Sequence, residues 1–318
     1  MMKKALITGG AGFIGSHLAK SLLEKGYSVV IVDNFNEYYD SQLKRDRISK
    51  ILNGLDFKLY ELDICNLKEL KSVFEKEKID IICHLAAQAG VRYSIDNPFV
   101  YEKSNVLGTL NILELSKDYG VEKIVFASSS SVYGNSNKEY FSEEDDTSSP
   151  VSLYAATKKA TEVICHSYHT LYDIPMIGLR YFTVYGPYGR PDMALFKFTD
   201  AIIKGEPIDV FGDGKMERSF TYIDDIVSGT IKAMESDFFW EIFNLGSKPV
   251  SLLSLIEEIE KNAKKKSEKV FMPIQKGDVL RTSADISKAK NLLDWEPKTS
   301  IDVGVSNFVN WYRQYYSI

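Results

Sequence analysis

The sequence predicts an α/β protein with a doubly wound parallel sheet and a smaller C-terminal lobe that is interleaved with it. Short apolar strand patterns alternate with helical patterns up to about residue 246, which is typical of a parallel sheet covered by helices. The chain has 318 residues, enough for a large domain and a smaller one.

The composition excludes several classes of function. Hydrophobic residues make up 44% of the chain and charged residues 26%, and the net charge of -5 is spread along the sequence, so we expect neither a nucleic-acid nor a membrane partner. The three cysteines and four histidines have no disulfide or metal-ligand spacing, and we predict no metal. The first apolar run is too short for a signal peptide and no stretch could span a bilayer, which predicts a cytoplasmic protein.

The N-terminal stretch predicts a dinucleotide site. A buried-strand pattern at residues 5–8 runs into a glycine loop, and a helical pattern follows at residues 16–25. Glycines allow a tight turn and a close approach to a pyrophosphate, and the helix N-terminus offers free amides to the anion. The predicted cofactor-binding residues of this loop are Gly9, Gly12, Phe13, Ile14 and Gly15.

The end of the second predicted strand, residues 27–32, indicates which dinucleotide binds. Asp33 follows it about 20 residues after the loop, where an acid contacts the ribose 2'-hydroxyl. Asn34 offers no cation for a 2'-phosphate, so the cofactor is predicted to be NAD rather than NADP.

Further cofactor contacts are expected in and after the next two strands, residues 61–64 and 79–85. Asp63, with Ile64 beside it, is a candidate for the adenine edge, although a turn or capping role fits Asp63 nearly as well. Residues after the fourth strand should lie at the carboxyl edge of the sheet, where ligands bind. They include Ala86, Ala87, Gln88 and Arg92, the last either a phosphate ligand or an ordinary loop arginine.

Tyr154 and Lys158 are the candidate catalytic pair. They are one helical turn apart at the start of a helical pattern that continues to Tyr172. A fixed ammonium favours the phenolate and lowers the pKa of a tyrosine, which would then accept a proton near neutral pH. Taken alone, such a pair is more often a solvated surface pair. Four serines, residues 128–131, end the strand at residues 123–127 and should meet this phenol at the ligand edge.

These motifs together resemble the extended short-chain dehydrogenase/reductases, and among them the nucleotide-sugar epimerases. The resemblance covers nearly the whole chain and implies a Rossmann domain and hydride transfer with NAD. It assigns Ser129 as the serine that polarises the substrate, beside Tyr154 as base and Lys158 as its electrostatic partner. It also implies a homodimer, paired through the helices expected at residues 105–118 and 154–172.

The C-terminal half resembles the substrate lobe of the same family. Thr183 stands where many sugar epimerases carry asparagine, and residues 189–196 are similar to the signature of UDP-glucuronate 4-epimerases. An arginine on a proline-braced loop suits bidentate capture of a carboxylate, which gives Arg190 a role in substrate binding. The alternative for Arg190 is a surface ion pair with Asp192.

The remaining substrate contacts come from the resemblance. Phe211 would lie against the uracil, Arg218 would bind the diphosphate, and Asp278 would contact the substrate ribose. For Arg218, an ion pair with Asp224 or Asp225 is the alternative. The expected domains are residues 1–182 plus about 218–246 for NAD, and 183–217 plus 247–318 for the nucleotide sugar.

The function implied is the NAD-dependent conversion of UDP-glucuronate to UDP-galacturonate through a 4-keto intermediate. A UDP-glucuronate decarboxylase and a 4-epimerase of a neutral UDP-sugar are alternative enzymes, and an NAD-sensing binding protein is the alternative outside catalysis. A 4,6-dehydratase is disfavoured, because Ser130 and Ser131 stand where such relatives carry an acid/base pair.

Overall fold

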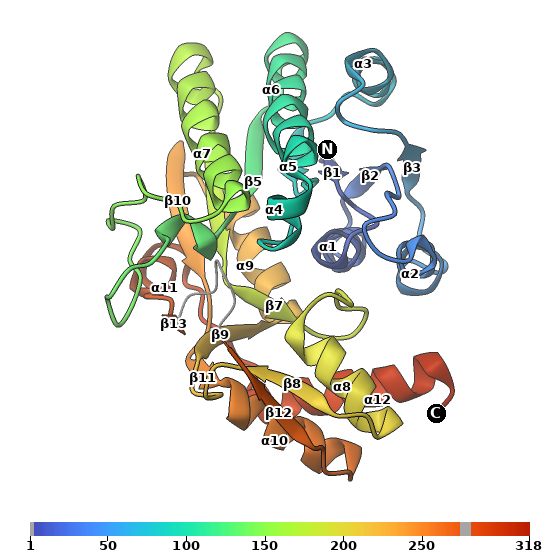
Figure 1. Ribbon diagram of the computed structural model, residues 1–318. Coiled ribbons are helices and arrows are strands. Elements are labelled where there is room, and N and C mark those ends of the chain that lie inside the picture. Colours follow the sequence, from blue (N-terminus) through green and yellow to red (C-terminus); the bar gives the residue numbers. More distant parts are fainter. Residues whose placement is uncertain (1–2, 274–280) are drawn as a thin grey trace.

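The computed structural model describes residues 3–273 and 281–318, and its largest element is a seven-stranded parallel sheet (Figure 1). The strand order is β10-β6-β5-β4-β1-β2-β3. The chain adds β2 and β3 on one side of β1 and then crosses back to add β4 and the later strands on its other side. This confirms the predicted doubly wound α/β fold. The strands are β1 (Lys4–Thr8), β2 (Ser28–Asp33), β3 (Lys58–Glu61), β4 (Ile81–His84), β5 (Lys123–Ser129), β6 (Met176–Tyr181) and β10 (Trp240–Leu245).

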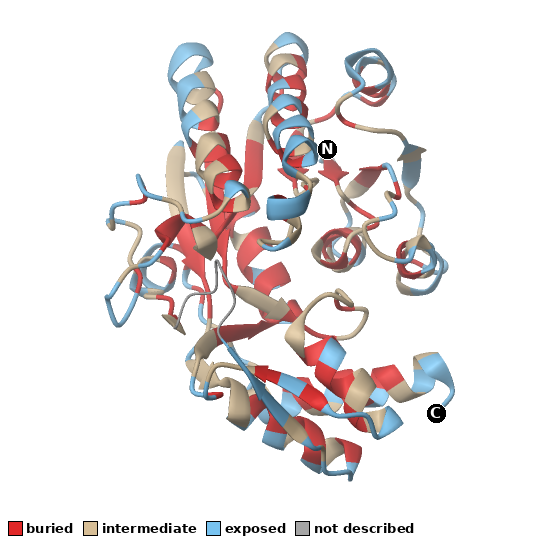
Figure 2. Cartoon of the chain, in the orientation of Figure 1, coloured by how far each residue is buried: buried red, intermediate tan, exposed pale blue. Residues whose placement is uncertain are grey.

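Helices cover both faces of this sheet because successive strand residues point to opposite sides. Ile7 of β1 packs in one buried cluster with Leu18 of α1, whereas its neighbour Leu6 packs in another with Ile112 of α6. Figure 2 shows the buried strands between these helical layers. The main helices are α1 (Phe13–Glu24) and α9 (Ile223–Glu235) on one face, and α3 (Leu67–Glu77), α6 (Gly108–Tyr119) and α7 (Leu153–Tyr172) on the other.

The described residues of the smaller lobe form two short sheets and four helices. Strand β9 pairs with β7, β11 and β13, while β8 pairs with β12. The strands are β7 (Thr183–Tyr185), β8 (Ile208–Phe211), β9 (Glu217–Tyr222), β11 (Pro249–Ser251), β12 (Lys269–Met272) and β13 (Arg281–Thr282). The helices are α8 (Ala194–Lys204), α10 (Leu252–Ala263), α11 (Ser287–Leu293) and α12 (Ile301–Tyr316).

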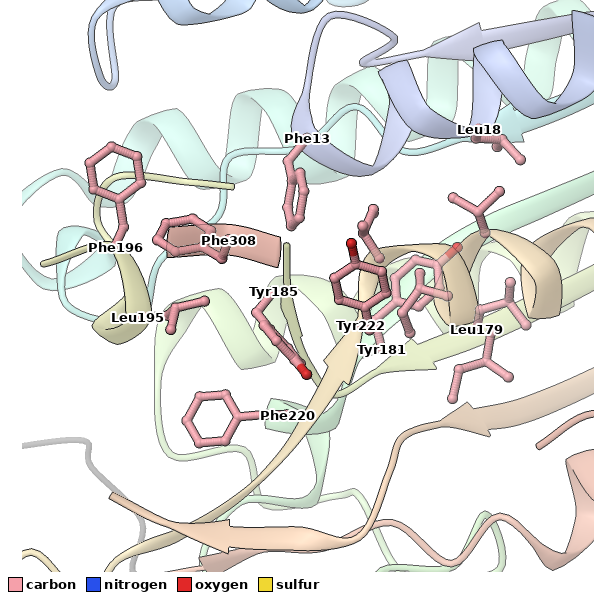
Figure 3. Close-up of a cluster of buried hydrophobic side chains, with 14 of the residues drawn as sticks. Phe13, Leu18, Leu179, Tyr181, Tyr185, Leu195, Phe196, Phe220, Tyr222 and Phe308 are labelled. Atoms are coloured by element: carbon pink, nitrogen blue, oxygen red, sulfur yellow. The ribbon is translucent and has the colours of Figure 1, made fainter. Parts of the chain in front are cut away.

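A continuous apolar core joins the lobe to one face of the large sheet. Phe13 at the start of α1, Tyr185 of β7 and Phe308 of α12 belong to one buried cluster (Figure 3). The division into an NAD-binding domain and a nucleotide-sugar-binding lobe stays a prediction. Because β9 pairs with β7, β11 and β13, residues 217–222 are better assigned to the lobe.

Several short helices follow strands β2, β4 and β5. They are α2 (Ser41–Asp46), the π-helical turn η1 (Arg47–Ile51), α4 (Tyr93–Asp96), α5 (Pro98–Tyr101), the π-helical turn η2 (Glu102–Leu107) and the 3₁₀ turn η3 (Ser130–Tyr133). Within the described residues, no helix combines the length and the apolar character that crossing a bilayer requires.

Three predicted boundaries are wrong by a few residues. Helix α1 begins at Phe13 rather than Ser16, because Gly12 is already its N-cap residue. Strand β3 ends at Glu61, so Asp63 lies beyond it rather than within it. The helix expected from Asn105 begins as the turn η2, three residues earlier.

Candidate active site

A cavity of about 1030 Å³ lies at the carboxyl ends of the parallel strands, between the large sheet and the lobe. Its lining includes all the predicted site residues that the structure describes; Asp278 lies outside the described residues. The described set is Gly9, Gly12, Phe13, Ile14, Gly15, Asp33, Asn34, Asp63, Ile64, Ala86, Ala87, Gln88, Arg92, Ser129, Tyr154, Lys158, Thr183, Arg190, Phe211 and Arg218. Their individual roles remain predictions.

The glycine loop has the close contacts that its sequence predicts. Gly9 has a φ of +71°, and a Cβ atom there would lie 2.8 Å from the backbone of Ala86. A Cβ on Gly15 would lie 2.3 Å from the carbonyl oxygen of Gly9. Gly12 caps α1 without a side-chain hydrogen bond, which leaves the helix N-terminus open to an anion.

The acid that ends β2 is held by backbone amides. Asp33 accepts hydrogen bonds from the amides of Ala11, at 3.0 Å, and Phe35, at 2.9 Å. Burial raises the pKa of Asp33, against the opposing effect of these amides and of the nearby Lys44 and Arg47. Each carboxylate oxygen keeps a second lone pair, so the group can still accept a hydrogen bond from a hydroxyl.

Asp63 combines the two roles weighed for it. Its Oδ1 accepts from the amide of Cys65 at 2.8 Å, which is a turn contact, and its Oδ2 accepts from the side chain of Asn34 at 3.3 Å. Because Asp63 also lines the cavity, the turn contact does not remove it from the site.

The catalytic candidates are positioned by β5 and α7. Ser152 caps α7 by accepting from the amide of Ala155 at 3.1 Å, so Tyr154 lies in the first helical turn, as predicted. Lys158 follows one turn later, and its Nζ donates to the carbonyl of Ala127 in β5 at 2.8 Å. Burial lowers the pKa of Lys158 to about 8.

The predicted electrostatics of Tyr154 are wrong in one respect. Burial raises the pKa of Tyr154, and the two influences that lower it are a hydrogen bond with Ser129 and the charge of Arg190. Lys158, predicted to supply the lowering charge, is not among the groups that shift the pKa of Tyr154, and its ammonium donates to the Ala127 carbonyl. The loss of hydration on burial disfavours the phenolate form of Tyr154 more than the positive charge of Arg190 favours it.

A buried polar network holds the serine cluster in place. Ser129 accepts from the amide of Ser131 at 3.2 Å and from its hydroxyl at 2.8 Å. Behind it, Ser128 donates to Glu162 at 2.6 Å, and Glu162 accepts two hydrogen bonds from Arg180, at 2.8 and 3.0 Å. Glu162 and Arg180 are only 2% and 3% exposed, so the network is shielded from water.

Arg190 already has a carboxylate partner. Its Nε and Nη2 donate to the two oxygens of Asp192, at 3.0 and 2.5 Å, so the ion pair weighed as the alternative is present. Their side chains are 24% and 27% exposed and line the cavity. The two hydrogen bonds to Asp192 use Nε and Nη2 of Arg190. The positive charge of Arg190 opposes the rise in the pKa of Tyr154 that burial causes.

Two other predicted contacts meet across the cavity. The guanidinium of Arg92, from the segment after β4, lies 5.0 Å from the ring centre of Phe211 in β8. Arg218 of β9 donates to the carbonyl of Glu217 at 2.8 Å. Residues expected to bind one ligand therefore come from both parts of the chain.

Sequence reasoning missed a group of cavity residues after β2. Tyr38 donates to Asp192 at 3.1 Å, and Lys44 donates to the carbonyl and side-chain oxygens of Asn36, both at 2.7 Å. Burial lowers the pKa of Lys44 to about 8. The available signal was two adjacent tyrosines and a basic run in a segment without strand or helix periodicity.

Residues 5–246 match the model of the NAD dependent epimerase/dehydratase family. The chain belongs to this family. It is 51% identical to an uncharacterized protein of Methanocaldococcus jannaschii over 98% of this chain and 97% of that protein. It is 47% identical to a UDP-glucuronate 4-epimerase of Thermodesulfobacterium geofontis, over 97% of this chain and 96% of the relative.

A solved structure of this family has the same fold over its whole length. The UDP-glucuronic acid 4-epimerase of Bacillus cereus, in complex with UDP-glucuronic acid and NAD, matches with a TM-score of 0.93 and 38% identity. The match covers 98% of this chain and 100% of that one. The protein is an NAD-dependent nucleotide-sugar epimerase, as the sequence motifs predicted.

Proposed function

We propose that this epimerase interconverts UDP-glucuronate and UDP-galacturonate by inverting carbon 4. The observation that carries this proposal is the position of Arg190, a cation that lines the same cavity as Tyr154 and Ser129. A substrate with its 4-hydroxyl at Tyr154 would bring the carboxylate on carbon 5 into the cavity that this cation lines. The names of the T. geofontis and B. cereus relatives support the same substrate.

The proposed cofactor contacts follow from the geometry of the cavity. The open N-terminus of α1 and the glycine loop would bind the pyrophosphate, and Asp33 would accept from the ribose hydroxyls. Bound NAD supplies a hydride acceptor and donor for carbon 4 of the sugar. Asn34, Asp63 and Ile64 would surround the adenosine half, and Ala86, Ala87 and Gln88 would line the site at the end of β4.

In the proposed reaction Tyr154 removes the proton of the 4-hydroxyl and later returns it. Ser129 hydrogen-bonds the same oxygen, and Lys158, which lines the cavity one helical turn from Tyr154, is proposed to bind the cofactor with its ammonium. With a pKa near 8, Lys158 is mostly protonated at neutral pH. The resulting 4-keto sugar turns to present its other face. Return of the hydride to that face of carbon 4 inverts the centre, and Tyr154 returns the proton to the 4-oxygen.

The carboxylate must be restrained while the ketone exists. A 4-ketouronate is a β-keto acid and loses carbon dioxide when the carboxylate bond aligns with the carbonyl π system. Thr183 and Arg190, which line the same cavity, are proposed to hold the carboxylate out of that alignment. A decarboxylase would share the catalytic residues but relax this restraint.

The nucleotide half of the substrate has its own candidate contacts. Phe211 offers a ring to the uracil, and Arg92 and Arg218 line the cavity with cations suited to the diphosphate. These residues lie apart in sequence from the 186–193 loop that carries Arg190, so substrate anchoring and sugar selection can be tested separately.

Incubation with UDP-glucuronate and no added cofactor, followed by proton NMR, tests the proposal. We expect a new galacturonate anomeric signal, because NAD should be retained through the cycle. A pentose signal with release of carbon dioxide would identify a decarboxylase. Turnover of UDP-glucose alone would identify an epimerase of neutral sugars, and no turnover of any sugar would favour a binding protein.

We also propose that the protein forms a homodimer through α6 and α7. These helices lie side by side on one face of the sheet (Figure 1). Apolar side chains are exposed along them and on the adjoining turn η2: Leu107, Leu110, Val163, Leu171 and Tyr172. Light scattering at micromolar concentration should give twice the mass of the chain, whereas a monomer would contradict the proposal.

A further inference from the structure

Arg47 is a fully buried cation that lies outside the proposed reaction. Its exposed fraction is 0%, and within the described part of the chain no carboxylate lies within ion-pair distance of it. Its N–H groups instead donate hydrogen bonds to uncharged carbonyl and hydroxyl oxygens. Burying a guanidinium is costly unless its N–H groups are satisfied, so the partners that Arg47 bonds indicate what its position achieves.

All five N–H groups of Arg47 have an acceptor, and these acceptors come from three segments. Nε and Nη2 donate to the carbonyl of Tyr188 at 3.0 and 2.8 Å, and Nη2 also donates to that of Gly189 at 3.4 Å. Nη1 donates to the carbonyl of Ala11 at 3.3 Å and to the hydroxyl of Tyr39 at 2.6 Å. Arg47 therefore ties the glycine loop to the residues immediately before Arg190.

The 186–193 loop depends on such contacts because it lies outside regular secondary structure. Tyr188 has a φ of +60°, a conformation that is unfavourable for a residue other than glycine. The carbonyl of this strained residue is the one that accepts two hydrogen bonds from Arg47. The ring of Tyr188 also packs on Trp311, with ring centres 4.9 Å apart.

Tyr38 holds the other end of the same loop. Its hydroxyl donates to Asp192 at 3.1 Å, and Asp192 in turn accepts from Arg190. Burial raises the pKa of Tyr38 to about 12, so it remains a donor at neutral pH. Tyr38 and Arg47 both belong to the segment of residues 34–47, which follows the cofactor strand β2.

We propose that Arg47 and Tyr38 are positioning residues that clamp the 186–193 loop onto the cofactor-binding domain. Arg47 fixes the loop backbone ahead of Arg190, and Tyr38 fixes Asp192, so that the guanidinium of Arg190 is held at the cavity wall for the sugar. This inference rests on the proposed function, because the acidic group that Arg190 would meet is the carboxylate of a uronate. Selectivity for an acidic sugar would thus depend on how the loop that carries Arg190 is held, and Arg47 contributes to this from outside the cavity lining.

The test compares Arg47→Lys and Tyr38→Phe with the wild-type holoenzyme. Lysine keeps the charge but lacks the planar fork that reaches three segments, and phenylalanine removes a single hydroxyl. Arg45→Lys is the matched control, because Arg45 is exposed, pairs with Glu61 and does not line the cavity. Dissociation constants for UDP-glucuronate and UDP-glucose are measured by calorimetry, and amide hydrogen exchange is followed over residues 186–193.

For Arg47→Lys we expect the affinity for UDP-glucuronate to fall about tenfold and that for UDP-glucose to change less than about twofold. Exchange in residues 186–193 should accelerate about tenfold, with Arg45→Lys unchanged. Tyr38→Phe should weaken the binding of UDP-glucuronate and accelerate exchange in residues 186–193 by about threefold each. This variant provides the test if Arg47→Lys does not fold.

Three results would overturn the clamp or its premise. Equal loss of affinity for both sugars would make Arg47 and Tyr38 general structural residues. Unchanged exchange in residues 186–193 of both variants would overturn the clamp itself. A wild-type enzyme that does not favour UDP-glucuronate would overturn the proposed function, while the exchange data would still decide whether the loop is clamped.

Discussion

The Tyr154 region and the Arg190 region line one cavity but are built in different ways. Tyr154, Lys158 and Ser129 lie on α7 and β5, where backbone hydrogen bonds of a helix and a central strand fix their positions. Arg190 lies on an irregular loop that is held by side chains from the segment of residues 34–47. The proposed catalytic residues are therefore positioned by secondary structure, and the residue proposed to select the sugar is positioned by tertiary contacts.

The ion pairs of the two regions show the same difference. Glu162 and Arg180, behind the serines, are 2% and 3% exposed, and no ligand can reach them. Arg190 and Asp192 are 24% and 27% exposed, and the pair lines the cavity. Of these two pairs, the second is the one that a ligand in the cavity could contact. The first is a structural support, and the second is suited to recognition.

The largest expected effect lies in the Tyr154 region. Tyr154→Phe removes the proposed base, so turnover should fall about 100-fold or more while NAD stays bound and both UDP-sugars still bind. Single-turnover kinetics with a cofactor absorbance assay measures this. If the variant kept most of its activity, Tyr154 would not be the base.

Glu162→Gln should weaken the support of this region, because it leaves the buried charge of Arg180 unpaired. The free energy of unfolding should fall by about 3 kcal/mol. The exposed Glu24→Gln, which breaks a pair with Lys20, should cost less than about 0.5 kcal/mol. Urea denaturation measures both, and equal effects would contradict the distinction between the regions.

The same pair predicts a pH dependence. Burial raises the pKa of Glu162, but the hydrogen bonds and charge of Arg180 outweigh burial and leave the pKa below its usual value. Its contribution to stability is therefore complete above the unfolded pKa of about 4.3 and is lost as the pH falls through the folded pKa. The difference between wild type and Glu162→Gln should shrink over that acid range.

A smaller effect is expected at the cofactor end. Asp33 should favour the free ribose hydroxyls of NAD over the 2'-phosphate of NADP by about tenfold or more. Lys44 lies nearby and reduces this preference, although its ammonium is already bonded to Asn36. Calorimetry on cofactor-free protein compares the two dinucleotides, and equal affinities would contradict the role of Asp33.

The sequence predicts most of the catalytic region because its signals are local. The glycine loop, the strand end at Ser129 and the turn from Tyr154 to Lys158 each lie within a few residues of one element. The raised pKa of Tyr154 was not predictable, since it depends on burial by distant segments. Tyr38 and Arg47 were also missed, because their partners lie about 140 to 150 residues away in the sequence and no periodic pattern marks them.

The most direct test of the comparison between the two regions is the binding of two sugars to Arg190→Ala. UDP-glucuronate and UDP-glucose differ in the carboxylate, while Phe211 and Arg218 are unchanged in the variant. Deleting one partner of a charge pair in a partly dry site typically costs a few kcal/mol, so the dissociation constant for UDP-glucuronate should rise about 30-fold or more. That for UDP-glucose should change less than about twofold. Equal weakening of both sugars would make Arg190 structural and would contradict the separation of chemistry from sugar selection.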